Sequence, residues 1–377
     1  MGKIQAGSDI EEDGRAWVHG KKSRQGLLSG VWTRLILLYR QLLRQFDFKP
    51  KKRLGQHFLV DEAVLERILS AAELSPGDIV IEIGPGLGIL TEALAKQGAR
   101  VIGVELDVKL VALLKKRLAG FPDVKIVHAD VLKAAPWQLL QDNLPACDLV
   151  RGYKVIANLP YYITSPVLSH FLEAQPRPSK MVVMVQKEVG EAIAAAPGKM
   201  RLLSVKTQFY SRPAIVSYVP AASFYPPPKV DSVVLRLDVY SQPPLVKSGV
   251  SDVAGFFDIV MHGFSAPRKQ LRNSLAHSLE MPPGQVVSLL EKAGIEPKRR
   301  AETLRLEEWR ELWKVFAPFL CRPEPFTSGH PERSEGSCDA QGKLREGEEC
   351  SPAQGKLREG SRDSSVARLP QNDIRGE

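Results

Sequence analysis

The stretch VIANLPYYITSP, residues 155–166, places an amide, a proline and two tyrosines directly after a short apolar run. The Asn158 side chain and the Leu159 carbonyl are hydrogen-bond acceptors, and Pro160 restricts the backbone so that this carbonyl keeps one direction. Tyr161 offers a face on which a base can stack, an interaction worth on the order of 1–3 kcal/mol. The combination predicts a pocket for a flat polar ring. The alternative is an ordinary turn at a strand end, with its aromatics in the core.

An exocyclic amino group of a base would be the reacting group in such a pocket. Its lone pair is delocalised into the ring, so two acceptors aimed at its hydrogens would favour a pyramidal, more nucleophilic nitrogen. A base reaches such a site from a single strand or by flipping out of a helix. We therefore expect methyl transfer driven mainly by positioning and electrostatics. In SFYPPPKV, Phe224 could cover the other face of the base and Lys229 could meet a phosphate, with a core phenylalanine as the alternative.

A cofactor site is predicted upstream of this turn. In EIGPGLG, Gly84, Gly86 and Gly88 follow a predicted strand and open a helix, so that backbone can approach a ligand closely. The next strand ends in Glu105, an acceptor for a ribose diol, and the third ends in Asp130, an acceptor for an adenine amino group. Either acid alone could be a helix N-cap. Together with Asn158 they predict a site for an adenosine-containing cofactor.

S-adenosylmethionine fits this site better than a nucleoside triphosphate, because the chain has no GxxxxGK[ST] phosphate loop. The stretch KKRLGQHFLVD, residues 51–61, precedes the Gly-rich strand and could close over the cofactor. His57 and the backbone of Leu59 would then face it. The alternative is a capping turn with Phe58 in the core.

The elements that must position these residues alternate along the chain. Short apolar runs at 78–84, 100–107, 124–130, 154–158 and 180–186 are joined through helical patterns. Fully apolar strands joined in this way predict a doubly wound, Rossmann-like α/β domain with a parallel sheet. Two later runs, AIVSYVP and VDSVVLRLDVY, have no helix between them and predict antiparallel strands that finish the sheet.

Composition changes along the chain predict four parts. The last part is poor in apolar residues and contains QGKLREG twice, which is typical of a disordered segment. The parts are an N-terminal extension at 1–48 with a basic helix near 32–46, the α/β domain at 49–245, a small all-helical domain at 246–320, and a low-complexity tail at 321–377.

Overall composition narrows the class of protein. The 377 residues are 44% hydrophobic, enough for a sizeable core, and the net charge of +9 favours a polyanionic partner. The four cysteines form no CxxC pair, so we expect neither a metal site nor a disulfide framework. No apolar run approaches the roughly 18 residues of a membrane span, and the N-terminus lacks the form of a signal peptide. We expect a soluble, cytoplasmic monomer without a membrane partner.

Taken together, KKRLGQHFLVD, IEIGPGLGILTEAL, VIGVELD, ANLPYYITSPVL, VQKEVGEAIAAAPG, SFYPPPKVDSVVLRL and FSAPRKQLRNSL resemble the small-subunit (16S) rRNA adenine N6,N6-dimethyltransferase family. The resemblance runs from about Phe46 to Phe319. It implies S-adenosylmethionine-dependent dimethylation of two adjacent adenosines near the 3′ end of small-subunit rRNA, on immature small ribosomal subunits, late in assembly. The implied cofactor contacts are His57, Leu59, Gly84, Glu105, Asp130 and Asn158, and the implied base-handling residues are Asn158, Leu159, Tyr161 and Phe224.

The chain departs from the family pattern at two places. After APG at 196–198 it reads KMRLLSV where a Tyr-Gly is usual, and His57 stands where many members have asparagine. In the last domain, RKQLRNSL and EPKRRAETL predict a basic surface for rRNA phosphates, with Arg268, Lys269 and Arg272 as candidate contacts.

Three alternatives stay open on the sequence. A related family methylates large-subunit rRNA and confers macrolide resistance, but it typically reads Asn-Ile-Pro-Tyr and lacks the QKEVGE and PPPKVDS forms. DNA adenine methylation would suit the amide-containing turn, although no duplex-reading module is apparent. A non-catalytic RNA-binding or ribosome-assembly factor on the same fold is the third, and the intact candidate site argues against it.

Overall fold

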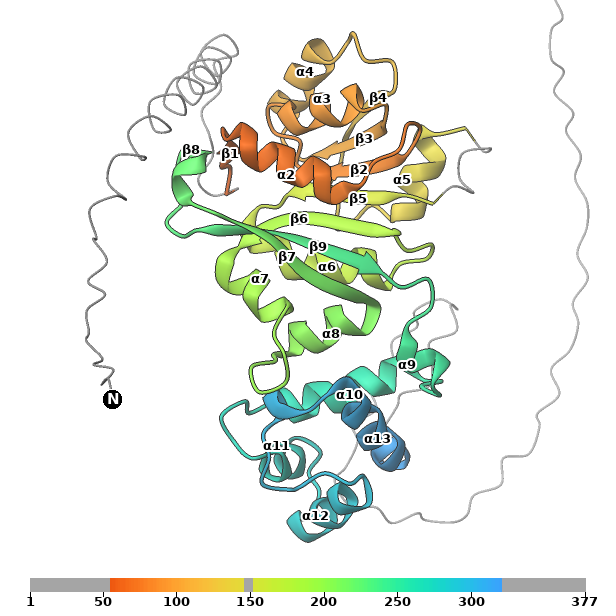
Figure 1. Cartoon of the computed structure of the whole chain (residues 1–377). Coiled ribbons are helices and arrows are strands. Elements are labelled where there is room, and N and C mark those ends of the chain that lie inside the picture. The colour runs from red at the N-terminus through yellow and green to blue at the C-terminus, as the bar shows by residue number, and fades with distance from the viewer. Residues whose placement is uncertain (1–54, 146–151, 321–377) are drawn as a thin grey trace, which may run out of the picture. The chain divides into compact units, whose positions relative to one another are not determined.

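The computed structural model describes residues 55–145 and 152–320. The predicted basic helix near 32–46 and the predicted tail lie outside the described residues. Within them, one sheet of seven strands dominates the structure (Figure 1). In order across the sheet, the strands are β4 (Val124–His128), β3 (Arg100–Glu105), β2 (Ile79–Ile83), β5 (Lys154–Asn158), β6 (Lys180–Gln186), β9 (Ser232–Val239) and β7 (Ser211–Val219).

Strand directions follow the predicted plan. β4, β3, β2, β5 and β6 are parallel, and β9 is antiparallel to both of its neighbours, β6 and β7. The predicted parallel α/β sheet with antiparallel strands at its end is therefore confirmed, and β5 and β6 have the predicted bounds. Because the five parallel strands share one direction, their carboxyl ends lie at one edge of the sheet.

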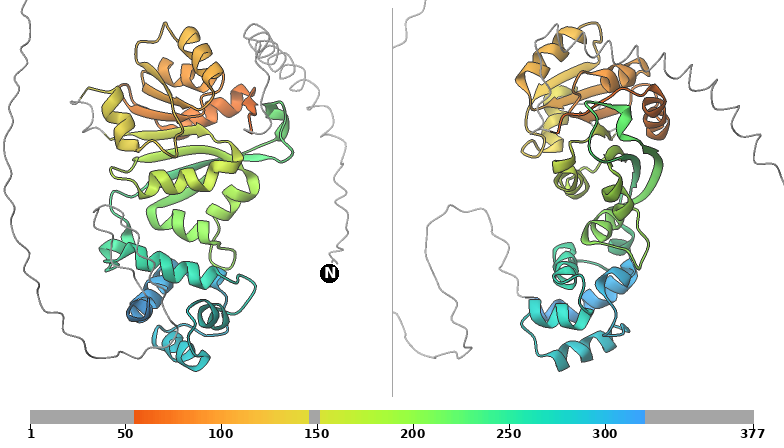
Figure 2. Two further views of the ribbon diagram at one scale, coloured as in Figure 1. Left: turned by 180° about the vertical axis from the view of Figure 1, so that it is seen from behind. Right: turned by 90° about the vertical axis from the view of Figure 1, so that its left-hand side faces the viewer.

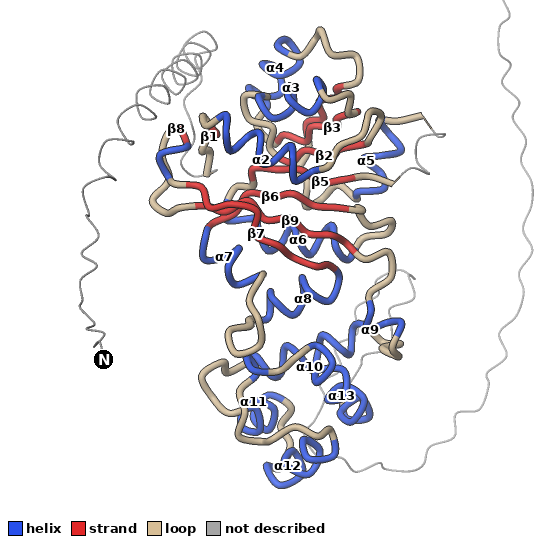
Figure 3. Tube along the Cα trace, in the orientation of Figure 1, coloured by secondary structure: helices blue, strands red, loops and turns tan. Residues whose placement is uncertain are grey.

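The central strands are apolar on both faces because helices cover both faces (Figures 2 and 3). Val80 of β2 packs in a cluster with Val64 and Ile68 of α2, whereas Ile81 belongs to the cluster on the opposite face with Phe171 of α6. The helices of the α/β part are α2 (Glu62–Ala72), α3 (Ile89–Lys96), α4 (Val108–Arg117), α5 (Pro136–Asn143), α6 (Thr164–Glu173), α7 (Lys187–Ile193) and α8 (Leu202–Tyr210).

The C-terminal part of the described chain is helical. Its helices are α9 (Pro244–Lys247), α10 (Val253–Phe264), α11 (Leu271–Ser278), α12 (Pro283–Lys292) and α13 (Leu306–Phe316). The ring of Phe209 in α8 lies 5.0 Å from that of Phe256 in α10, and both belong to one apolar cluster that continues from the sheet into the helices. The boundary predicted between residues 245 and 246 falls within α9.

No helix in the described part of the chain is long and apolar enough to cross a membrane.

Candidate active site

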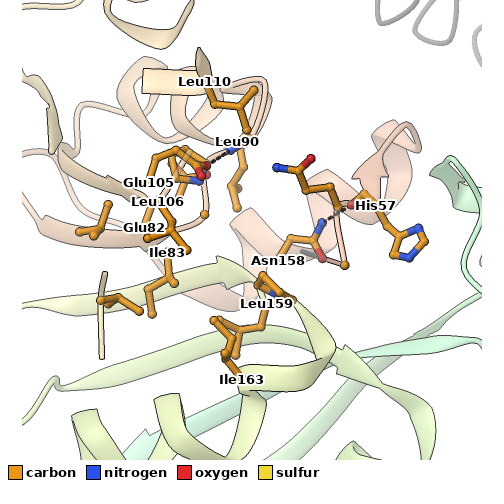
Figure 4. A pocket seen from close by; sticks show the side chains of 18 of the residues that line it. His57, Glu82, Ile83, Leu90, Glu105, Leu106, Leu110, Asn158, Leu159 and Ile163 are labelled. Atoms are coloured by element: carbon orange, nitrogen blue, oxygen red, sulfur yellow. Dashed lines mark hydrogen bonds between the residues drawn. The ribbon is translucent and has the colours of Figure 1, made fainter. Parts of the chain in front are cut away.

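A cavity of about 280 Å³ opens at the carboxyl ends of the parallel strands (Figure 4). Ten of the site residues predicted from the sequence line it, and they come from five separate segments of the chain. They are His57, Leu59, Gly84, Gly86, Glu105, Asp130, Asn158, Leu159, Pro160 and Tyr161. The structure therefore brings together both the predicted cofactor residues and the predicted Asn-Leu-Pro-Tyr turn.

The Gly-rich turn between β2 and α3 forms one wall. Gly86 has a φ of +60°, which favours glycine, and a Cβ placed there would lie 3.0 Å from the ring of Phe58, which would have to shift. On the side of the turn facing α4, Arg117 donates to the Leu87 carbonyl and pairs with Glu92 at 2.7 Å. The turn is thus held in place by α4 as well as by its own sequence.

Glu105 shapes this wall as well as lining it. Its Oε2 accepts from the Gly86 amide at 3.2 Å and its Oε1 from the Asp107 amide at 2.9 Å. Burial raises the pKa of this carboxyl, while the backbone amides of Asp107, Gly86 and Leu106 act in the opposite direction. Asp130, after β4, accepts from the Leu132 amide at 3.1 Å and so also caps its own turn. Both acids keep further lone pairs for a ligand.

Three carboxyl groups line the cavity, from Glu82, Glu105 and Asp130, and no lysine or arginine among the described residues does. This charge pattern suits a ligand that carries cationic or donor groups, and it does not suit a polyphosphate. S-adenosylmethionine, with a sulfonium, an ammonium and a ribose diol, fits these donors and acceptors. Glu105 and Asp130 would hold its adenosine part, and the backbone at Gly84 and Gly86 would lie beside it.

Glu82 is a candidate residue that the sequence reasoning missed. Its side chain is 1% exposed, and its Oε2 has no hydrogen-bond partner among the described residues. A buried carboxyl oxygen without a partner is costly unless a ligand satisfies it. The signal in the sequence was a carboxylate within the otherwise apolar strand IVIEI.

Glu82 also makes stability depend on pH. Burial, with the nearby Glu105 charge adding to it, raises the pKa of Glu82 from 4.5 to about 8. Between these values the folded protein keeps a proton that the unfolded chain releases, so the free energy of unfolding falls as pH rises. In the ligand-free wild type, we expect the free energy of unfolding to fall by on the order of 1–4 kcal/mol between pH 5 and pH 8. We expect Glu82→Gln to abolish this fall.

Thermal unfolding of ligand-free wild type and Glu82→Gln across this pH range checks the prediction. Glu66→Gln, at an exposed position of α2, is the matched control and should follow the wild type. Parallel pH curves for Glu82→Gln and wild type would contradict it.

The turn after β5 presents its acceptors in a defined way. Nδ2 of Asn158 donates to the His57 carbonyl at 2.9 Å, which leaves Oδ1 as the acceptor of this side chain (Figure 4). The Leu159 amide donates to the Met184 carbonyl at 3.1 Å, and no group in the described residues donates to the Leu159 carbonyl. Tyr161 begins the short helix η3 (Tyr161–Ile163), and its hydroxyl lies 2.8 Å from Ser232 Oγ.

His57 and Phe224 are placed differently from the sequence expectation. The imidazole of His57 turns away from the cavity, and its Nδ1 lies 2.7 Å from the Pro226 carbonyl oxygen, so its main chain is the part beside Asn158 (Figure 4). Phe224, in the two-residue strand β8 (Phe224–Tyr225), is 3% exposed and packs in a core cluster with Val64 and Val234. The structure does not bring Phe224 to the cavity, because β8 directs it into that core.

The candidate RNA-binding residues lie outside the cavity. Lys229 is exposed in the loop before β9, and Arg268 and Lys269 are exposed before α11. Arg272 is half-buried and donates to Gln270 at 3.0 Å. The amides of Leu271 and Arg272 donate to the carbonyls of Arg299 and Pro297, so the two basic stretches predicted from the sequence lie side by side.

Comparison with known proteins gives consistent results. The family model for "Ribosomal RNA adenine dimethylase" matches residues 47–317. The chain is 46% identical over 282 residues to Ribosomal RNA small subunit methyltransferase A of Dehalococcoides mccartyi (strain ATCC BAA-2266 / KCTC 15142 / 195), covering 75% of this chain and 94% of that protein. It is 43% identical over 278 residues to the protein of the same name from Moorella thermoacetica, covering 73% and 95%.

Two solved structures share the fold over most of the described residues. A dimethyladenosine transferase from Plasmodium falciparum aligns with a TM-score of 0.58 and 25% identity, covering 70% of this chain and 98% of that chain. The 23S rRNA methyltransferase ErmE aligns with a TM-score of 0.53 and 29% identity, covering 69% and 99%.

Proposed function

The chain belongs to the ribosomal RNA adenine dimethylase family, and we propose from this that it dimethylates the N6 amino groups of two adjacent adenosines near the 3′ end of small-subunit rRNA. It is an S-adenosylmethionine-dependent rRNA adenine dimethyltransferase. The observation that supports the chemistry best is the cavity itself, where an oriented amide oxygen and three carboxyl groups converge without a lining lysine or arginine among the described residues.

The protein promotes methyl transfer by positioning the target amino group relative to the methyl group. S-adenosylmethionine, when bound, supplies an electrophilic methyl group. Oδ1 of Asn158 and the Leu159 carbonyl accept the two hydrogens of the target amino group, which favours a pyramidal nitrogen with a directed lone pair. Pro160 holds the turn, and Tyr161 offers a stacking face. The proton can leave after the new bond forms, so the step needs no general base.

The small subunit is favoured over the large one as substrate. Relatives that are 46% and 43% identical carry the small-subunit name, whereas the 23S enzyme is 29% identical. We propose that the protein acts as a monomer in the cytoplasm, on immature small subunits late in assembly. The basic surface formed by residues 268–272 and 296–300 would contact rRNA phosphates there.

The basic surface leads to a prediction about salt. Reversing the charge of both Arg268 and Lys269 to Glu should weaken rRNA binding and reduce the slope of log K against log salt by about 1 per lost phosphate contact. Binding titrations between low and moderate salt measure the slope. The control is the double change Lys115→Glu and Lys125→Glu, which alters net charge equally at exposed sites on the α4–β4 side. An unchanged slope in the first variant would remove these residues from the interface.

The function is tested by transferring labelled methyl from S-adenosylmethionine to immature small subunits and digesting the RNA to nucleosides. Dimethyladenosine in small subunits, with none in large subunits, is the expected result. Label only in large subunits would reassign the substrate. No label at all, with cofactor binding intact, would support the alternative that the protein is a non-catalytic assembly factor.

A further inference from the structure

Two segments that are far apart in the sequence form one unit beside the cavity. The two-residue strand β1 (Phe58–Leu59) pairs antiparallel with β8. After β1, the Val60 amide donates to the Ser223 carbonyl at 2.8 Å, and the Ser223 hydroxyl donates to Asp61 at 2.8 Å. The segment at 55–61 is therefore tied, on the C-terminal side of β1, to residues 223–231, which contain three consecutive prolines and are called the Pro-rich loop below.

On the N-terminal side of β1, the connection is made by His57. Its Nδ1 lies 2.7 Å from the Pro226 carbonyl oxygen. Because a carbonyl can only accept, this nitrogen carries the hydrogen and donates it. This hydrogen bond extends the pairing of β1 with β8, which is only two residues long, by one residue. Without it, the carbonyl of His57 would lie at the frayed end of that pair.

The same residue contacts the turn after β5 in two ways. Its imidazole stacks on the ring of Tyr161, with centroids 5.9 Å apart and planes inclined by 23°. Its main-chain carbonyl accepts from Nδ2 of Asn158 at 2.9 Å (Figure 4). Tyr161 is tied in turn to Ser232, at the far end of the Pro-rich loop. His57 thus lies where these three segments of the chain meet.

We propose that His57 is a positioning residue for methyl transfer. Its imidazole anchors its own main chain to the Pro-rich loop through the hydrogen bond to Pro226. Its carbonyl then accepts from Nδ2 of Asn158, so that Oδ1 of Asn158 points toward the target amino group. The ring is directed at Pro226 and Tyr161, so in this proposal it acts through these contacts and neither accepts a proton from the substrate nor holds the cofactor. This inference rests on the proposed function, because Asn158 is the group through which His57 acts.

Two substitutions separate the donor from the ring. His57→Asn keeps a donor near the position of Nδ1 and removes the ring. His57→Phe keeps a ring that can stack on Tyr161 and removes the donor. Because a lost neutral hydrogen bond corresponds to about 1 kcal/mol, we expect His57→Phe to lower kcat by about five- to tenfold. His57→Asn should restore most of that loss, and S-adenosylmethionine affinity should change by less than about twofold in both.

The measurements are kcat, KM for RNA, the dissociation constant of S-adenosylmethionine and the melting temperature of each variant. His170→Ala is the matched control, because its imidazole also bonds a backbone carbonyl, that of Ala134 at 3.0 Å, away from Asn158. It should lower the melting temperature without lowering kcat. A loss that tracks melting temperature in all three variants would show a merely structural role for His57 and overturn the proposal.

Three further outcomes would each overturn the positioning role. Unchanged kcat in His57→Phe would overturn the positioning role. Equal losses in His57→Phe and His57→Asn would show that the imidazole itself is needed, as a proton acceptor would be. A loss of cofactor affinity alone, with kcat unchanged, would show that the ring contributes to cofactor binding. Failure of the wild type to methylate would reject the proposed function, whereas wild-type activity with unaffected variants rejects only this inference.

Discussion

Asn158→Ala should lower methyl transfer by a factor of about 10² to 10³, in line with removal of one oriented group from a preorganised site. The reason is geometric. Because Nδ2 of Asn158 is engaged by the His57 carbonyl, Oδ1 is the atom left to accept from the target amino group. Alanine removes that acceptor and leaves the His57 carbonyl without its donor. Affinity for S-adenosylmethionine should stay largely intact, since Glu105, Asp130 and the Gly-rich turn are untouched.

Single-turnover methylation, together with equilibrium binding of S-adenosylmethionine, checks this expectation. Asn143→Ala is a matched control, because Nδ2 of Asn143 also donates to a backbone carbonyl, that of Leu139 at 2.9 Å, outside the cavity. It should methylate at the wild-type rate. Unaltered turnover in Asn158→Ala would refute the acceptor role.

Glu105→Gln should weaken S-adenosylmethionine binding by about 10- to 100-fold, because two hydrogen bonds to a charged acceptor, each worth about 1.5–3 kcal/mol, are disturbed together. Both carboxylate oxygens of Glu105 accept from backbone amides, Oε2 from Gly86 and Oε1 from Asp107. The glutamine NH2 group would have to face one of these amides, donor against donor. The Gly-rich turn would then move, and the acceptor for the ribose diol would be weakened as well.

The effect should appear in cofactor affinity more than in the rate at saturating cofactor. Calorimetric titration and methylation at several cofactor concentrations separate the two. Glu66→Gln makes the same chemical change on an exposed face of α2 and should bind the cofactor normally. Wild-type affinity in Glu105→Gln would mean that the carboxylate neither shapes the turn nor holds the ligand.

The regular part of the fold was predictable because its signals are local. Apolar runs mark strands buried on both faces, and helical patterns between them require parallel neighbours. β5 and β6 therefore have the bounds expected from the sequence. The continuous core between the sheet and the C-terminal helices was not predictable, since contacts such as Phe209 on Phe256 carry no signature in either segment alone.

By itself, the sequence determined which strand ends meet at the cavity. Parallel strands bring their carboxyl ends to one edge, so the Gly-rich turn, Glu105, Asp130 and Asn158 had to converge once the strands were recognised. Only the tertiary structure decided how individual side chains are used there. His57 turns to Pro226, 169 residues away, and Phe224 is buried in the core beside Val64. Such orientations depend on long-range hydrogen bonds and packing, which no local pattern of residues encodes.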